Sequence, residues 1–303
     1  MKLIRRYHFW RALGSRIVPS LGSIWRLVAK RLYRYPKKKA PKATLPYTLL
    51  MFSDDRHLEM LTESLWSLAS TWKALPNLCI VGDRGSTERV FRKTLSWWPQ
   101  AWTYIAYEQI EKEFINDSQD LLVQFGRHHI FGRKFAAILY SARTVPTFYT
   151  DSDVLWYNQP RFIEAINLQE SRLLLSIDPH PGYYEPMIDQ SAQDLMQPPY
   201  ACAGLLFISG WPWPEVELEK WVERAINLPP HSFAEQTIFA WLARRYGGYI
   251  PDSEIGAFWD DWYFILPRTF EPKWSTRHYF GPVRHHFHRD ALLLRWGIFR
   301  RRG

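Results

Sequence analysis

The stretch TFYTDSDVLW at residues 147–156 combines an apolar strand pattern with two acidic residues, Asp151 and Asp153, placed one residue apart. Side chains at positions i and i+2 of a strand point to the same side, so the two carboxylates would repel each other there. A divalent cation such as Mg²⁺ or Mn²⁺ removes this repulsion because it prefers carboxylate oxygens, and it keeps open positions that substrate phosphates fill. The stretch therefore predicts a buried strand that ends at a metal–diphosphate site.

The sequence around this stretch alternates between strand and helix patterns. Strands are expected at 47–53, 77–86, 102–106, 172–180 and 201–209, and helices at 54–71, 131–143, 216–226 and 233–247. Strands and helices that alternate through short turns predict a mostly parallel sheet, so we expect one α/β domain over residues 46–303. Ligands of such sheets bind at the carboxyl ends of the strands. Four acidic residues fall at such ends: Asp83, Asp151, Asp153 and Asp178.

The positive charge of the chain is confined to its first part. The net charge is +9, but residues 1–53 hold 13 Lys or Arg and no acidic residue, which leaves 26 basic and 30 acidic residues in the remainder. A mildly acidic body argues against nucleic acid as a partner. The only cysteines, Cys79 and Cys202, lie in apolar strands without metal spacing, which fits a reducing cytoplasm.

Residues 1–45 form a basic N-terminal arm that ends in a Pro/Lys-rich linker. Gly14, Pro19 and Gly22 are expected to kink or split a helix there. The helix is predicted because apolar residues recur at helical steps: Trp10, Leu13, Ile17, Leu21, Ile24, Val28 and Leu32. No apolar run is long enough to span a bilayer, and no secretory signal is evident. The arm is either a peripheral anchor on the anionic cytoplasmic membrane face or a helix that is solvated or docked on the body.

The acidic motif TDSDV, after its apolar strand, resembles the DxD motif of GT-A glycosyltransferases, which use nucleotide-diphosphate sugars. Two upstream segments are similar to parts of the same family. The resemblance of FGRKFAAILYSA implies that Lys134, 17 residues before Asp151, reaches the ribose or diphosphate. The resemblance of VGDRGS implies that Asp83 binds the base and ribose, with the end of the first strand, residues 52–54, as a companion contact.

Two downstream segments extend the resemblance toward the reacting end of the donor. ACAGLLFIS and FAEQTIF resemble the NAG-type strand and the acid–Gln helix start of retaining GT-A enzymes, although Cys202 stands where the family has Asn. Gly204 permits close backbone approach there. The resemblance implies that Glu235 and Gln236 lie near the anomeric carbon or the acceptor hydroxyl, with Glu235 as a candidate base. We group Asp178, at a neighbouring strand end, with these catalytic candidates.

The segment HYFGPVRHHF at 278–287 resembles the H-[FY]-x-G-x-x-K segment of the glycogenin-like and galactosyltransferase-like branch. The resemblance implies that His278 is the third metal ligand beside Asp151 and Asp153. It also implies that Gly281 admits a phosphate near the backbone and that Arg284, in place of Lys, binds the diphosphate. Three further histidines are rival ligands: His285, His286 and His288.

The motifs together predict a hexosyltransferase with a GT-A fold. It would use Mn²⁺ or Mg²⁺ and a UDP-sugar or similar donor, and it would act on a glycan or a lipid-linked acceptor. Retention is favoured over inversion because the His segment belongs to retaining branches. One alternative is an aspartate-nucleophile phosphatase, which also carries DxD after a strand, normally the first of its domain. The other is a membrane-surface sugar-binding protein with a degenerate site, which the change to Cys202 favours.

Overall fold

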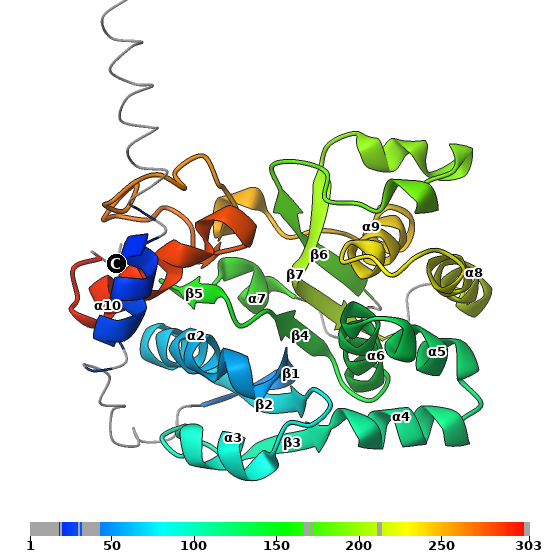
Figure 1. Cartoon of the computed structure of the whole chain (residues 1–303), viewed down its shortest axis with the longest axis horizontal. Coiled ribbons are helices and arrows are strands. Elements are labelled where there is room, and N and C mark those ends of the chain that lie inside the picture. The colour runs from blue at the N-terminus through cyan, green and yellow to red at the C-terminus, as the bar shows by residue number, and fades with distance from the viewer. Residues whose placement is uncertain are drawn as a thin grey trace, which may run out of the picture.

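The computed structural model describes residues 18, 20–29, 31, 43–166, 170, 172–210 and 214–299. Its centre is a seven-stranded sheet (Figure 1), whose strands in spatial order are β3 (Trp102–Ala106), β2 (Leu75–Gly82), β1 (Thr44–Ser53), β4 (Thr147–Thr150), β7 (Tyr200–Ser209), β6 (Arg172–Asp178) and β8 (Gly248–Tyr249). Only β7 runs antiparallel to its neighbours, β4 and β6, within this sheet. The prediction of a mostly parallel α/β sheet is therefore confirmed.

Helices cover both faces of the sheet because successive strand residues point to opposite sides. Leu50 of β1 faces a core built with α4 (Tyr107–Asn116), α5 (Asp120–His128), α6 (Ile130–Ala142), α8 (Glu215–Ile226) and α9 (Ala234–Tyr246). Its neighbours Leu49 and Met51 face the opposite core, which includes α2 (Leu58–Thr71) and α3 (Glu88–Thr94). The predicted helices are thus present, and the site lies at the edge where the parallel strands end.

The predicted strand over 147–156 is divided between two sheets. It leaves the large sheet after β4, turns through Asp151–Asp153, and continues as β5 (Val154–Trp156) in a three-stranded sheet with β10 (Thr276–His278) and β9 (Ile255–Gly256). The two carboxylates therefore lie on a turn, and the alternation of side chains along a single strand does not determine how they are oriented toward each other. Because β10 pairs with β5 so that His278 stands opposite Val154, the second sheet carries His278 to Asp153.

Within the N-terminal arm, residues 20–29 form a helix that contacts the body. Gly22 packs so closely on His285 that an added Cβ would lie 2.6 Å from its Cβ, and Arg26 pairs with Glu59 at 2.6 Å. The helix continues through Gly22, so the expectation that Gly22 splits the helix is wrong. Ile24 of the predicted apolar side is 52% exposed. Four of the predicted apolar positions lie outside the described residues: Trp10, Leu13, Ile17 and Leu32.

This packing supports the docked interpretation for residues 20–29, and it leaves the anchor interpretation as a prediction for the arm as a whole. Among the described helices, none has both the length and the apolar character needed to cross a bilayer.

Candidate active site

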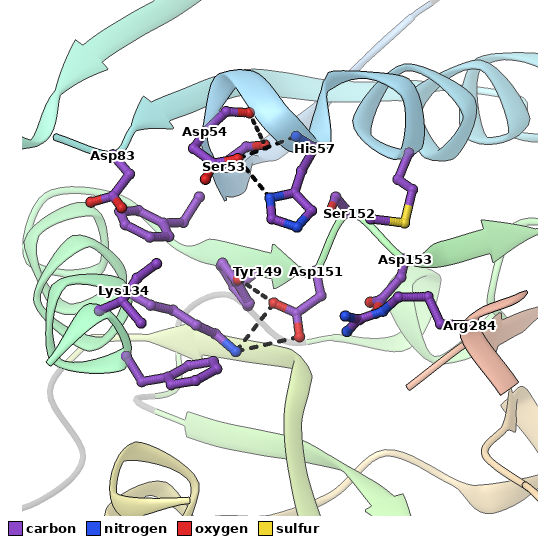
Figure 2. Close-up of a pocket in the computed structure, with 14 residues that line it drawn as sticks. Ser53, Asp54, His57, Asp83, Lys134, Tyr149, Asp151, Ser152, Asp153 and Arg284 are labelled. Carbon is purple, nitrogen blue, oxygen red and sulfur yellow. Dashed lines mark hydrogen bonds and ion pairs between the residues drawn. The ribbon is translucent and has the colours of Figure 1, made fainter. Parts of the chain in front are cut away.

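Two cavities meet at the carboxyl ends of β1, β2, β4 and β6. One has a volume of about 250 Å³ and is lined by Asp54, Asp83 and neighbouring residues of the first two strands (Figure 2). The other, of about 590 Å³, is lined by Asp178, Glu235 and Gln236 among others. Four residues line both cavities: Phe131, Lys134, Asp151 and Arg284. The predicted acidic motif therefore lies where the two cavities join.

Asp151, Asp153 and His278 converge as the sequence predicted. One ligand atom from each lies within 4.8 Å of the others, and His278 Nε2 is 3.2 Å from Asp153 Oδ1 and 3.8 Å from Asp151 Oδ2. Asp153 Oδ1 is buried, and the group that faces it is the His278 ring. Two carboxylates and an imidazole form a set that suits Mn²⁺, and carboxylates this close together are costly unless a cation lies between them. The residues present thus fit the predicted ion.

The ring of His278 occupies the space that Gly204 leaves on β7. A Cβ at Gly204 would lie 2.2 Å from His278 Cε1, so no larger residue fits without displacing the ring. The close approach predicted at Gly204 is real, and the group that approaches is this imidazole.

Two of the three rival histidines donate hydrogen bonds elsewhere, and the third is buried. His285 donates from Nε2 to the Trp262 carbonyl at 2.7 Å, and His286 donates to the Asp261 carbonyl at 3.0 Å. Burial lowers the pKa of His288 to about 4, which keeps its ring neutral. Among the described residues, only His278 joins the two carboxylates in a group able to hold a metal ion.

Lys134 on α6 lies between two carboxylates. Its Nζ is 3.2 Å from Asp151 Oδ1 (Figure 2). It is also 3.2 Å from Glu235 Oε1 and donates to the Ala203 carbonyl at 3.1 Å. Burial opposes the charge of Lys134, but Asp151 and Glu235 outweigh it and raise the lysine pKa. The ammonium is therefore held by protein oxygens, while the side chain still lines both cavities.

Arg284 makes a two-pronged contact with Asp153. Its Nε and Nη2 donate to Asp153 Oδ2 at 2.9 and 2.7 Å. Burial opposes ionisation of Asp153, but His278 and Arg284 together lower its pKa to about 2. Gly281, which begins the 3-10 turn that carries Arg284, has φ +44, a value that side-chain-bearing residues rarely adopt. The arginine thus occupies one oxygen of Asp153 and leaves the other toward His278.

Two side chains at the site were not predicted. Arg133 donates to both carboxylate oxygens of Asp83 at 2.6 and 3.1 Å, so Asp83 is already paired where it lines the smaller cavity. Tyr149 donates from its hydroxyl to Asp151 Oδ1 at 2.5 Å. The signal for Tyr149 was available, because a side chain that can donate a hydrogen bond stands only two residues before Asp151. Arg133 is adjacent to Lys134 but points to a different strand end.

The larger cavity has acidic groups with raised pKa values on its floor. Burial raises the pKa of Glu235 to about 7 against the opposing charge of Lys134, and burial raises the pKa of Asp178 to about 6. Gln236 donates to the Gly182 carbonyl at 2.7 Å and accepts from the Ala203 N–H at 3.3 Å. Both carboxyl groups can therefore take or release a proton near neutral pH, whereas the Gln236 amide ties a loop to β7.

Comparison with solved structures places these features on a known fold. The galactosyltransferase LgtC, solved with donor and acceptor sugar analogs, is 16% identical over 80% of this chain and 95% of its own, with a TM-score of 0.51. Mouse xyloside xylosyltransferase 1 is 14% identical over 77% of this chain and 97% of its own, with a TM-score of 0.53. GlyE of Streptococcus pneumoniae is 12% identical over 84% and 62%, with a TM-score of 0.52.

These similarities show that the chain has the GT-A fold, as the sequence predicted. No protein-family model and no curated protein sequence matches the chain.

Proposed function

We propose that this protein is a metal-dependent glycosyltransferase that moves a sugar from a UDP-sugar or similar donor to a glycan or lipid-linked acceptor. The observation that carries the proposal is the convergence of Asp151, Asp153 and His278 at the junction of the two cavities. The smaller cavity is suited to the nucleotide and the larger one to the sugar. The GT-A fold, and the donor and acceptor analogs present in the LgtC structure, support this assignment.

The three ligands would hold Mn²⁺ or Mg²⁺, which, when bound, neutralises the diphosphate as it leaves. Arg284 uses Nε and Nη2 for Asp153, which leaves Nη1 for a phosphate oxygen. Lys134 keeps Asp151 and Glu235 close together beside the reacting end of the donor. Glu235, with a pKa of about 7, orients the acceptor hydroxyl or takes its proton.

The two alternatives predict different products. An aspartate-nucleophile phosphatase would release phosphate from simple phosphomonoesters, but the acidic motif here follows β4 of a GT-A sheet, an interior strand between β1 and β7. A degenerate sugar-binding protein would bind donors without turnover. Cys202 contacts the ring of His278, so the change from Asn does not by itself favour a degenerate site.

The test is a screen of UDP-, GDP- and dTDP-sugars for hydrolysis and transfer in the presence of Mn²⁺. We expect turnover of at least one UDP-sugar, which EDTA abolishes and Mn²⁺ restores. Release of phosphate from p-nitrophenyl phosphate without sugar-nucleotide turnover would instead establish the phosphatase. Donor binding by calorimetry without any turnover would establish the degenerate binding protein.

Cys202 is expected to orient His278 for the ion. Its Sγ lies 3.5 Å from His278 Nδ1, while Nε2 faces the carboxylates. Metal-binding histidines need a partner for the second ring nitrogen, and loss of that partner costs about 10–100-fold in metal affinity. Cys202→Ala should therefore weaken Mn²⁺ binding about tenfold by calorimetry, with Cys202→Ser partly restoring it. Cys79→Ala, in a buried strand outside both cavities, is the control, and equal affinities for all variants would contradict this role.

The cellular location of the protein and the membrane contact of its N-terminal arm stay predictions. Residues 1–45 are proposed to contact an anionic membrane surface from the cytoplasmic side, because their basic residues would be attracted to acidic lipids.

A further inference from the structure

The larger cavity has more room than the transferred sugar needs. Its volume is about 590 Å³. Cavities of about 300–1,000 Å³ enclose a whole drug-sized ligand, so one hexose placed beside Asp151 leaves the opposite end of the cavity free. That end is where a second reactant would lie within reach of Glu235.

The residues that line the cavity divide into a buried polar floor and an exposed rim. The floor contains Glu235, Cys202 and His278, all buried. Away from the end shared with the smaller cavity, six exposed lining residues other than Gly281 are rich in rings: Pro179, His180, Pro181, Ser232, Phe233 and Trp259. We define these six as the rim. No lysine or arginine is among them.

Two large aromatic side chains of the rim are open to solvent. Trp259 is 37% exposed and Phe233 is 43% exposed. The Trp259 ring lies beside the ring of His180, with 5.5 Å between centroids and 60° between planes. Exposed aromatic surface at the entrance of a polar cavity marks a binding surface.

Trp259 belongs to a loop that buried ionic contacts hold in place. Two residues after it, the fully buried Asp261 accepts two hydrogen bonds from Arg277 Nη2, both at 2.9 Å. His286 donates to the Asp261 carbonyl, and Arg289 donates to the Phe264 carbonyl at 2.9 Å. The loop is thus fixed to β10 and to α10 (Phe287–Arg295). A platform that is ordered before its ligand arrives loses little conformational entropy on binding.

Phe233 forms the second aromatic part of the rim, at the start of α9. Its carbonyl accepts hydrogen bonds from the Thr237 N–H at 2.9 Å and the Thr237 hydroxyl at 2.7 Å, and its ring contacts His231 at 5.5 Å between centroids. His231 in turn stacks on Tyr184 at 4.3 Å. Because Glu235 follows Phe233 by two residues, the same helix start presents an aromatic surface and an acidic group to the cavity.

The chemistry of the rim selects a class of ligand. A pyranose has an apolar C–H face that covers an aromatic ring and hydroxyl edges that bind polar groups such as those of the floor. An acidic sugar or a lipid diphosphate would need a cation, and the lysine and arginine that line this cavity, Lys134 and Arg284, lie at the end shared with the smaller cavity, away from the rim. We propose that the rim is an acceptor subsite that binds a neutral pyranose against Trp259. Its role as an acceptor site rests on the proposed glycosyltransferase function.

The test measures glycoside binding to the full-length wild-type protein and to its Trp259→Ala variant, by saturation-transfer NMR in the presence of UDP and Mn²⁺. The probes are methyl glycosides of glucose, galactose, mannose and N-acetylglucosamine, with methyl glucuronide as the acidic probe. We expect at least one neutral glycoside to bind, and Trp259→Ala to weaken its binding about tenfold. Trp259→Phe should retain most of the affinity. Trp296→Ala removes a tryptophan that is 53% exposed outside the cavity, and it should have no effect.

UDP affinity and donor hydrolysis, measured on the same variants, separate this inference from the proposed function. Trp259→Ala should leave both within about twofold of the wild type while raising the KM for the acceptor about tenfold. Absence of any donor turnover in the wild type would refute the glycosyltransferase function. The NMR result alone would then decide whether the rim binds a pyranose. Equal glycoside binding by wild type and Trp259→Ala, preference for the glucuronide, or no binding of any glycoside would overturn the subsite.

Discussion

Replacement of Asp153 by asparagine is expected to lower kcat/KM for the donor at least about a hundredfold, because it removes an anionic ligand from the proposed ion site and the charge that holds Arg284. The same variant should lose most of its affinity for Mn²⁺ in the absence of nucleotide. Calorimetry with Mn²⁺ alone measures the second effect directly, and steady-state turnover measures the first.

Two control variants make this result specific. Asp117→Asn changes an exposed carboxylate that pairs with Arg143, and it should leave Mn²⁺ affinity unchanged. His285→Gln alters a histidine whose ring contacts the Trp262 carbonyl, so it should retain the ion, whereas His278→Gln should lose it. Unchanged Mn²⁺ binding by a folded Asp153→Asn protein would refute the ligand set, and loss of the ion in His285→Gln but not His278→Gln would refute the choice of histidine.

Replacement of Lys134 by methionine is expected to lower the free energy of unfolding by about 3–5 kcal/mol at pH 8. The lysine is 6% exposed, and its removal leaves the buried Glu235 beside Asp151 without its cation. Glu235 already has a pKa raised from 4.5 to about 7, so its protonated form favours the folded state below pH 4.5 and this contribution is lost as the pH rises through 7. Loss of Lys134 raises that pKa further, and the deficit should be smaller at pH 5 than at pH 8.

Urea unfolding at the two pH values, with EDTA present, measures this effect. The double variant Lys134→Met/Glu235→Gln should recover part of the stability at pH 8, because it replaces the unpaired carboxylate with a neutral amide. Lys112→Met, at an exposed position of α4, is the matched control and should change stability by no more than about 0.5 kcal/mol. A deficit that grows on acidification would contradict the account of the Lys134 cluster.

The elements that the sequence predicted well are those whose pattern is local. The apolar runs of β2, β6 and β7 and the periodic helices α2, α6 and α9 each bury a face that their own residues define. The division of residues 147–156 between two sheets could not be predicted this way. Val154 and Trp156 are as apolar as Phe148, and only their pairing with β10 shows that the chain has entered another sheet.

The same distinction between local pattern and spatial contact separates the site residues that the sequence predicted from those that it did not. Asp151, Asp153, Lys134 and His278 were predicted because motif spacing marks them, and the structure brings them together. The pairing of Arg133 with Asp83, and of Arg284 with Asp153, depends on which strand ends meet in space. Cys202 was interpreted as a departure from a family pattern. Its contact with the His278 ring was invisible in the sequence because the two residues come from different sheets.

The pairing of β5 with β10 has a consequence for how the site comes into being. Every strand of the large sheet lies before residue 250, yet Asp153 meets Arg284 across 131 residues of chain. A growing chain can therefore build its central sheet, with Lys134 already beside Asp151, while His278 and Arg284, the partners of Asp153, have not yet been synthesised. Asp153 gains these partners only when β10 and the turn after it have docked, so a complete site requires that the whole domain has been assembled.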